Sequence, residues 1–308
     1  MDYVVLLEKM VIFIALMITG YFLARRGVIG PEFTRSASRL VIDVFMVGTI
    51  LSSIITTGSE QGIDNLGEIL LLTFTVIIAG YIIAAIAMKF FHIGQSQAPS
   101  FEILMAVGNS MFIALPIAQS IYGSYAVLIV SVSCIAFNAL LYSYGIWRLK
   151  GGTGDKIQLR DMISIPLVAT LIGILIVILK IPVPGVLMSL FSILSGATMP
   201  MSMIVIGASL GSVSLLEAFR NPSLALLSVM RLIVIPILSW MVCSLITNDS
   251  VLLMTCMIIA ASPSAVMITI LAIRYGQDSV FCSEGVLHTT VCSMVTIPLL
   301  IGLLSRFS

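Results

Sequence analysis

Residues 101–123 read FEILMAVGNSMFIALPIAQSIYG, and residues 254–276, which lie 153 positions later, read MTCMIIAASPSAVMITILAIRYG. Both stretches are apolar with small polar residues or proline near the middle, and both end in the pair Tyr-Gly. The same shift of 153 residues superimposes Gly20 on Gly173 and Pro31 on Pro184 without a gap. The sequence therefore predicts a diverged internal duplication.

The composition is that of a membrane protein. Hydrophobic residues make up 59% and charged residues 9% of the 308 residues, whereas soluble domains carry about 25% charged residues. Apolar stretches long enough to cross a hydrocarbon core of about 30 Å recur from end to end, so little chain remains for a soluble domain. The net charge of +1 gives no reason to expect a nucleic-acid partner. The five cysteines lie in apolar segments without metal-ligand spacing, which predicts a packing role, no metal site and no cofactor.

Apolar length and loop signals predict ten membrane-spanning helices, five in each half of the chain. Residues 1–150 form the first repeat, 151–160 a linker and 161–308 the second repeat. The stretch 10–24 is interpreted as part of the first span and not as a signal peptide, because it has no basic leader and no small-residue cleavage site. The predicted spans are 3–24, 37–57, 66–91, 99–121, 124–147, 161–180, 188–210, 222–246, 251–274 and 279–304.

Lysine and arginine residues crowd into alternate loops, which predicts the orientation of the chain. By the positive-inside rule, the side that carries Arg25, Arg26, Arg148 and Arg220 faces the cytoplasm. The linker is then cytoplasmic, and both termini lie on the non-cytoplasmic side of the inner (plasma) membrane. The second set of five spans crosses in the opposite sense to the first. Such inverted repeats are typical of secondary transporters.

Residues that interrupt helices occur at matched positions in spans 99–121 and 251–274. Proline removes one main-chain hydrogen bond and clashes with the preceding turn, so it frees carbonyl groups at membrane depth. The N-termini of the half-helices that result can hold an anion. A kink that only shapes packing is the alternative for either span alone, whereas the matched pair favours a binding site. The candidate substrate-binding residues of these spans are Asn109, Ser110, Pro116, Ser262, Pro263, Ser264 and Thr269.

Several motifs resemble those of one known family. Residues 109–117 followed by Tyr122-Gly123 resemble the fourth-helix motif of the auxin efflux carrier family, and residues 196–210 resemble its seventh helix. Residues 262–278 and 289–298 are similar to its ninth and tenth helices. The motifs occur in the family's order and cover essentially the whole chain.

The resemblance implies two inverted five-helix repeats whose fourth and ninth helices unwind and cross. It implies a scaffold domain of spans one, two, six and seven, and a transport domain of spans three to five and eight to ten. It places a substrate carboxylate near the crossing, with Asn138 facing the same cavity. Gly207 and Gly211 form a small-residue face suited to close packing within a protomer, or between protomers of a homodimer that meet through the scaffold domain.

Four ionisable residues are predicted to lie inside spans: Asp43, Arg231, Glu284 and His288. Glu284 and His288 share one helix face at i and i+4, and histidine changes charge near neutral pH. We therefore expect these residues, together with Arg231, to couple protons to transport. The alternative is a fixed ion pair that neutralises Arg231. For Asp43, a local pair with Arg39 is the alternative.

The function that these features favour is secondary transport of small organic anions, such as malate-like acids or indole acids, by an elevator-type alternating-access mechanism. The partners expected are a small carboxylate substrate and the lipid bilayer. One alternative is a sodium-coupled carrier of the bile-acid type, which would need clustered oxygen ligands for sodium. A more remote alternative is an intramembrane enzyme. The sequence gives it little support, because it contains no P-loop, HExxH or GxSxG motif in the required context.

Overall fold

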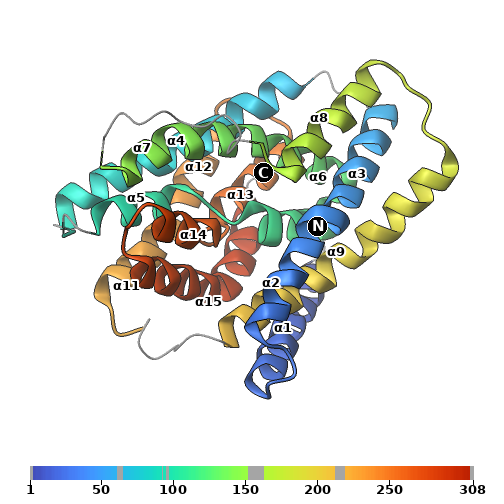
Figure 1. The fold of residues 1–308 in the computed structure, drawn as a ribbon. Coiled ribbons are helices and arrows are strands. Elements are labelled where there is room, and N and C mark those ends of the chain that lie inside the picture. The colour runs from blue at the N-terminus through green and yellow to red at the C-terminus, as the bar shows by residue number, and fades with distance from the viewer. Residues whose placement is uncertain are drawn as a thin grey trace. The chain divides into compact units, whose positions relative to one another are not determined.

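The computed structural model describes residues 3–60, 65–91, 93–94, 97–151, 163–211 and 219–305. In these ranges the chain is helical apart from short connections and contains no strand (Figure 1). The predicted linker lies almost entirely outside the described residues. Two apolar helices, Ile165–Ile178 and Ser250–Ala261, are shorter than a usual span. Within the described ranges, six helical stretches are long and apolar enough to cross a membrane: Pro31–Glu60, Leu66–Phe91, Ser110–Leu149, Gly185–Gly211, Pro222–Cys243 and Ser279–Leu304.

The chain divides into two compact units, and unit 1 comprises Met1–Ile69, Met111–Cys134 and Ser164–Val213. Its helix α9 runs alongside α1 and α2 (Figure 1). A Cβ atom added to Gly207 would overlap the main chain at Met17, so this glycine permits close contact between α9 and α1 of one protomer. The homodimer therefore stays a prediction, without support from this small-residue face. The helices are α1 (Tyr3–Arg25), α2 (Pro31–Leu40), the π-helical turn η1 (Val41–Phe45), α3 (Met46–Glu60), α8 (Ile165–Ile178) and α9 (Gly185–Gly211).

Unit 2 comprises Leu70–Ser110, Ile135–Ile163 and Ser214–Ser308. Its long helix α15 packs against α5, α11, α13 and α14, and Gly285 lets the side chain of Leu104 approach it closely. The helices are α4 (Leu66–Phe91), α5 (Ala98–Ala106), the end of α6 (Leu115–Leu140), η3 (Leu141–Gly145), α7 (Ile146–Leu149), α11 (Pro222–Val229), η5 (Met230–Val234), α12 (Ile235–Cys243), α13 (Ser250–Ala261), α14 (Met267–Arg274) and α15 (Ser279–Leu304).

Backbone conformations and helix ends recur at the spacing of the sequence repeat. Gly123 and Gly276, 153 residues apart, both have left-handed φ angles, of 73° and 67°. Gly123 bends α6 between the predicted fourth and fifth spans. Helix α1 ends at Arg25 and α8 at Ile178, again 153 residues apart. One left-handed glycine and one helix end thus recur in the two halves at this spacing.

The position of one helix interruption differs from the sequence prediction. The sequence predicts it at Pro116, whereas α5 ends at Ala106 and Pro116 is the second residue of α6. The π-helical turn η2 (Ser110–Ala114) directly precedes α6, as η5 directly precedes the α12 helix that carries Pro236. Proline has no N–H to donate, and the wider π turn leaves room for its ring, so the helix continues through it.

Candidate functional site

The two interrupted helices of unit 2 are joined at their interruptions. Helix α5 gives way to extended backbone at Val107, and α13 does so at Ser262. The N–H of Asn109 donates to the carbonyl of Pro263 at 2.7 Å, and the N–H of Ala265 donates to the carbonyl of Val107 at 3.1 Å. Gly108 and Ser264 thereby form an antiparallel bridge. Main-chain groups in an apolar region must find partners inside the protein, and here each interruption satisfies the other.

Three hydroxyl groups form hydrogen bonds with main-chain groups at these helix ends. The Ser264 Oγ donates to the carbonyl of Leu104 at 2.7 Å, and the Ser262 Oγ donates to the carbonyl of Ile259 at 2.7 Å. The N–H of Ser264 donates to the Thr289 Oγ1 at 3.2 Å. Two of the three serines predicted to bind substrate, Ser262 and Ser264, therefore donate to main-chain carbonyl groups in the last turns of the interrupted helices.

Arg231, in η5, lies at the same place and is only 2% exposed. Its Nε donates to the carbonyl of Ser262 at 3.0 Å, and its Nη1 donates to the carbonyls of Met105 and Ala106 at 2.9 and 3.4 Å. These acceptors are the last residues of α5 and the residue after α13. The guanidinium therefore bonds to main-chain carbonyls at the ends of both interrupted helices.

Some of the predicted substrate-binding residues lie at the two interruptions, and others lie elsewhere in the chain. Asn109 and Ser110 follow the first interruption and are 7% and 8% exposed. Thr269 is half-buried in the first turn of α14, and Asn138 is buried in the part of α6 that belongs to unit 2. Pro116 belongs to unit 1. The structure thus gathers Asn109, Ser110, Ser262, Pro263 and Ser264 at one place.

Of the residues predicted to couple protons, Arg231, Glu284 and His288 belong to unit 2 and Asp43 belongs to unit 1. His288, 5% exposed, bonds through Nδ1 to the Ser228 Oγ at 2.6 Å, and its ring lies 4.3 Å from that of Phe219. Glu284 lies one turn earlier on α15 and is half-buried. Asp43 is exposed in η1 of unit 1, and no salt bridge joins it to Arg39, although both residues are described.

The sequence analysis missed an acidic residue in the middle of α5. Glu102 is 1% exposed, and it accepts hydrogen bonds from the Tyr144 hydroxyl and the Arg148 Nε, both at 2.6 Å. The ring of Tyr81 packs edge-on against that of Tyr144, with centroids 4.9 Å apart. The sequence signal was an acidic residue inside an apolar span, but the partners lie more than 40 positions away, and no spacing rule links them.

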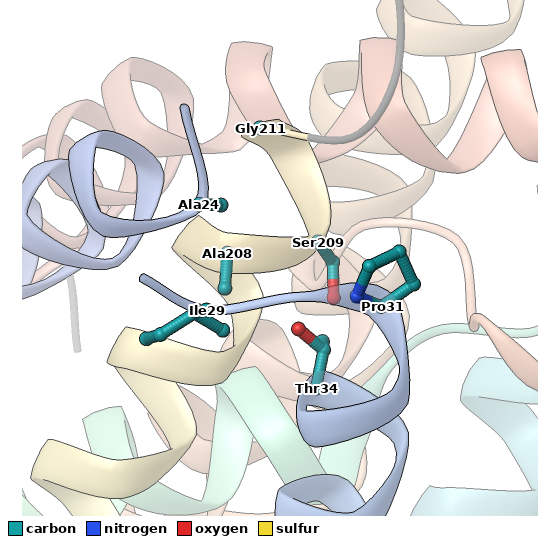
Figure 2. A pocket seen from close by; sticks show the side chains of 7 residues that line it. All are labelled: Ala24, Ile29, Pro31, Thr34, Ala208, Ser209 and Gly211. Carbon is teal, nitrogen blue, oxygen red and sulfur yellow. The ribbon is translucent and has the colours of Figure 1, made fainter. Parts of the chain in front are cut away.

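Unit 1 contains a separate pocket of about 420 Å³ (Figure 2). Its two hydroxyl groups bond to carbonyls of the preceding turn: Thr34 to Gly30 and Ser209 to Val205. None of the lining residues is charged or was predicted to bind substrate. They are Ala24, Ile29, Pro31, Thr34, Ala208, Ser209 and Gly211.

Nearly the whole chain matches a known protein family. Residues 5–301 match a family model described as "Membrane transport protein". The chain belongs to this family of membrane transport proteins. It is the auxin efflux carrier family that the motifs of spans four, seven, nine and ten resemble.

Two archaeal relatives of this transporter agree with that assignment. An "Uncharacterized transporter" of Methanothermobacter thermautotrophicus is 25% identical over 297 residues, which cover 95% of this chain and 96% of that protein. The "Uncharacterized transporter MJ1031" of Methanocaldococcus jannaschii is 23% identical over 301 residues, 95% of this chain and 97% of that protein. The similarity covers both halves of the chain, and together with the apolar helices it shows a multi-pass membrane protein.

Proposed function

We propose that this membrane transport protein is a secondary transporter of small organic anions, such as malate-like acids or indole acids. The observation that carries the proposal is the main-chain pairing of two helix interruptions, Val107–Asn109 and Ser262–Ala265. Non-helical backbone at membrane depth is tolerated where it is buried in protein or lines a cavity, and paired broken helices are typical of transporter binding sites.

The helix ends at the interruptions favour an anion. Helix α14 begins at Met267, directly after the second interruption, and η2 begins at Ser110, directly after the first. The N-terminus of a helix carries the positive end of its dipole and main-chain N–H groups without intrahelical partners. Asn109 directly precedes η2 and Ser110 begins it, and side-chain amides and hydroxyls can donate to a carboxylate.

The grouping of most helices supports an elevator-type mechanism, whereas residues 111–134 of predicted transport spans four and five group with unit 1. Helices α1, α2, α3, α8 and α9, which correspond to the predicted scaffold spans, belong to unit 1. Helices α11, α12, α13, α14 and α15, which correspond to predicted transport spans, belong to unit 2. The left-handed glycine and the helix end that recur at the 153-residue spacing support two five-helix repeats. The distribution of positive residues supports an inverted arrangement in the plasma membrane with both termini outside.

A proton-coupled mechanism through Glu284 and His288 is part of the proposal. His288 bonds to Ser228 of α11, so a change in its charge would act on the contact between α11 and α15. Uptake into proteoliposomes should depend on pH in the wild type and lose that dependence in Glu284→Gln. Unaltered pH dependence in this variant would remove Glu284 from the coupling mechanism.

The two alternative functions lack a matching site within the described residues. No group of three or more His, Cys, Asp or Glu side chains that could hold a metal ion occurs there. The Ser293 hydroxyl donates to the carbonyl of Thr290 on its own helix, where it has no base to activate it. A sodium-coupled carrier of the bile-acid type would show sodium-dependent binding, which calorimetry in sodium, potassium and choline chloride measures directly.

The proposal is tested by a thermal-shift screen of the purified protein against mono- and dicarboxylates, including malate and indole-3-acetate. We expect at least one acid to raise the unfolding temperature of the wild type and not that of Asn109→Ala. Thr19→Ala is the matched control, because Thr19 is exposed on α1 and bonds only to its own helix. A shift that persists unchanged in Asn109→Ala would place the binding site elsewhere.

A further inference from the structure

We propose that Arg231 is the resident cation of the paired interruptions. Its guanidinium occupies the position that a metal ion takes at the broken helices of cation-coupled carriers, and its fixed positive charge makes the site select anions. This inference rests on the proposed function, because the selected anion is the transported substrate.

The acceptors of Arg231 are the groups that a bound cation would use. Met105 and Ala106 end α5, and Ser262 follows the last residue of α13. Each helix therefore points the negative end of its dipole at the guanidinium. In secondary transporters, carbonyls of unwound backbone and C-terminal ends of half-helices coordinate sodium ions or protons. Here three such carbonyls accept hydrogen bonds from one buried side chain.

Gly108 shows that the site is shaped around this side chain. A Cβ atom at Gly108 would overlap the Arg231 Nη2 and lie 2.4 Å from the Ser262 Oγ, so only glycine leaves room for the guanidinium. The bonds to the carbonyls use Nε and Nη1. The Nη2 group therefore lies against the Cα of Gly108, next to Asn109, where its charge reaches a carboxylate held by Asn109.

A resident cation has two consequences for binding. The three carbonyls already accept hydrogen bonds from Arg231, so a metal ion is not needed to neutralise the two helix ends. The positive charge cannot leave with the substrate, so it favours a carboxylate over an uncharged analogue in every cycle.

The first experiment uses the wild-type protein. The affinity for a carboxylate from the screen is measured by calorimetry in sodium, potassium and choline chloride at equal ionic strength. We expect the three dissociation constants to agree within about twofold. A loss of more than about tenfold on removal of sodium would show that a metal ion is needed and would overturn the inference.

The second experiment varies the charge at position 231. The readout is the ratio of affinities for the carboxylate and for its uncharged amide, which a purely structural role would leave unchanged. Arg231→Lys keeps the charge and should keep most of this ratio, whereas Arg231→Met should lower it by more than about tenfold. Arg26→Met, at an exposed position of unit 1, is the control and should behave as the wild type.

A third measurement does not depend on the substrate. In Arg231→Ala, added methylguanidinium should raise the unfolding temperature, because it can re-occupy the three carbonyls, and it should not stabilise the wild type. Equal responses of the two proteins would contradict the inference, as would equal carboxylate-to-amide ratios in Arg231→Lys and Arg231→Met. If the wild type binds no carboxylate, the proposed function fails, while the methylguanidinium response still decides whether position 231 is a cation site.

Discussion

At the scale of single residues, the polar side chains at the interruptions bond mainly to the main chain. Ser262, Ser264 and Arg231 all donate to carbonyls at or next to the ends of the two interrupted helices. Composition and spacing identified these residues as important, because polar groups are rare in apolar spans. They could not assign the roles, since each acceptor except that of Ser262 lies more than 30 positions from its donor.

Gly108→Ala tests the fit of Arg231. The added methyl group would overlap the guanidinium, which has no free space to move into because it is buried on all sides. Overpacking of this kind costs about 1–3 kcal/mol, so we expect a lower unfolding temperature and weaker carboxylate binding. Gly196→Ala is the matched control, because an added Cβ there meets no atom within 4 Å. Equal stability of the two variants would contradict the geometry at Gly108.

Glu102→Gln tests the buried acid that the sequence analysis missed. The carboxylate accepts from Tyr144 and Arg148, and loss of its charge should cost about 1–3 kcal/mol through weakened bonds to a buried group. A double-mutant cycle with Arg148→Met, followed by thermal unfolding in detergent, should give a coupling energy of at least about 0.5 kcal/mol. The control is Glu32→Gln, on an exposed position of α2. Additive effects of Glu102→Gln and Arg148→Met would show that the ion pair does not contribute to stability.

At the scale of helices, the sequence predicted which spans are interrupted but only partly where. The second interruption contains Pro263, as expected from its position between two serines. The first lies at Val107–Asn109, and Pro116 is accommodated inside a continuous helix by the π turn before it. A single sequence carries no clear signal for a π turn, because the turn depends on how neighbouring helices pack. Glycine next to asparagine was the better local signal, since both disfavour a helix interior.

Pro116→Ala and Pro263→Ala therefore should have different effects. Alanine at position 116 leaves the pairing of Val107 with Ala265 intact, so we expect little change in carboxylate binding. Alanine at position 263 restores an N–H and helix propensity between α13 and α14, which should favour a continuous helix and weaken binding. Thermal shifts with the same carboxylate measure both variants. A larger loss in Pro116→Ala than in Pro263→Ala would contradict the assigned interruption.

At the scale of the whole molecule, hydropathy and the internal repeat were sufficient to predict an all-helical membrane protein. One left-handed glycine and one helix end recur at the spacing of 153 residues that the Tyr-Gly pairs first indicated. The pairing of Arg231 with Met105, 126 positions away, could not be predicted, because Arg231 has the apolar Ile78 at the equivalent position of the first repeat. A duplication accounts for an interruption in each half of the chain. The difference between Arg231 and Ile78 at equivalent positions accounts for a single positive charge at the two interruptions.

The central claim is that the paired interruptions form the binding site of an organic-anion transporter. Uptake of a radiolabelled carboxylate into proteoliposomes, with the same acid or its amide inside, tests it most directly. With the acid inside, we expect exchange by the wild type and by Thr19→Ala, and loss of exchange in Asn109→Ala. With the amide inside, we expect little exchange by any of these proteins. Exchange by Asn109→Ala at the wild-type rate, or equal exchange with acid and amide, would contradict the claim.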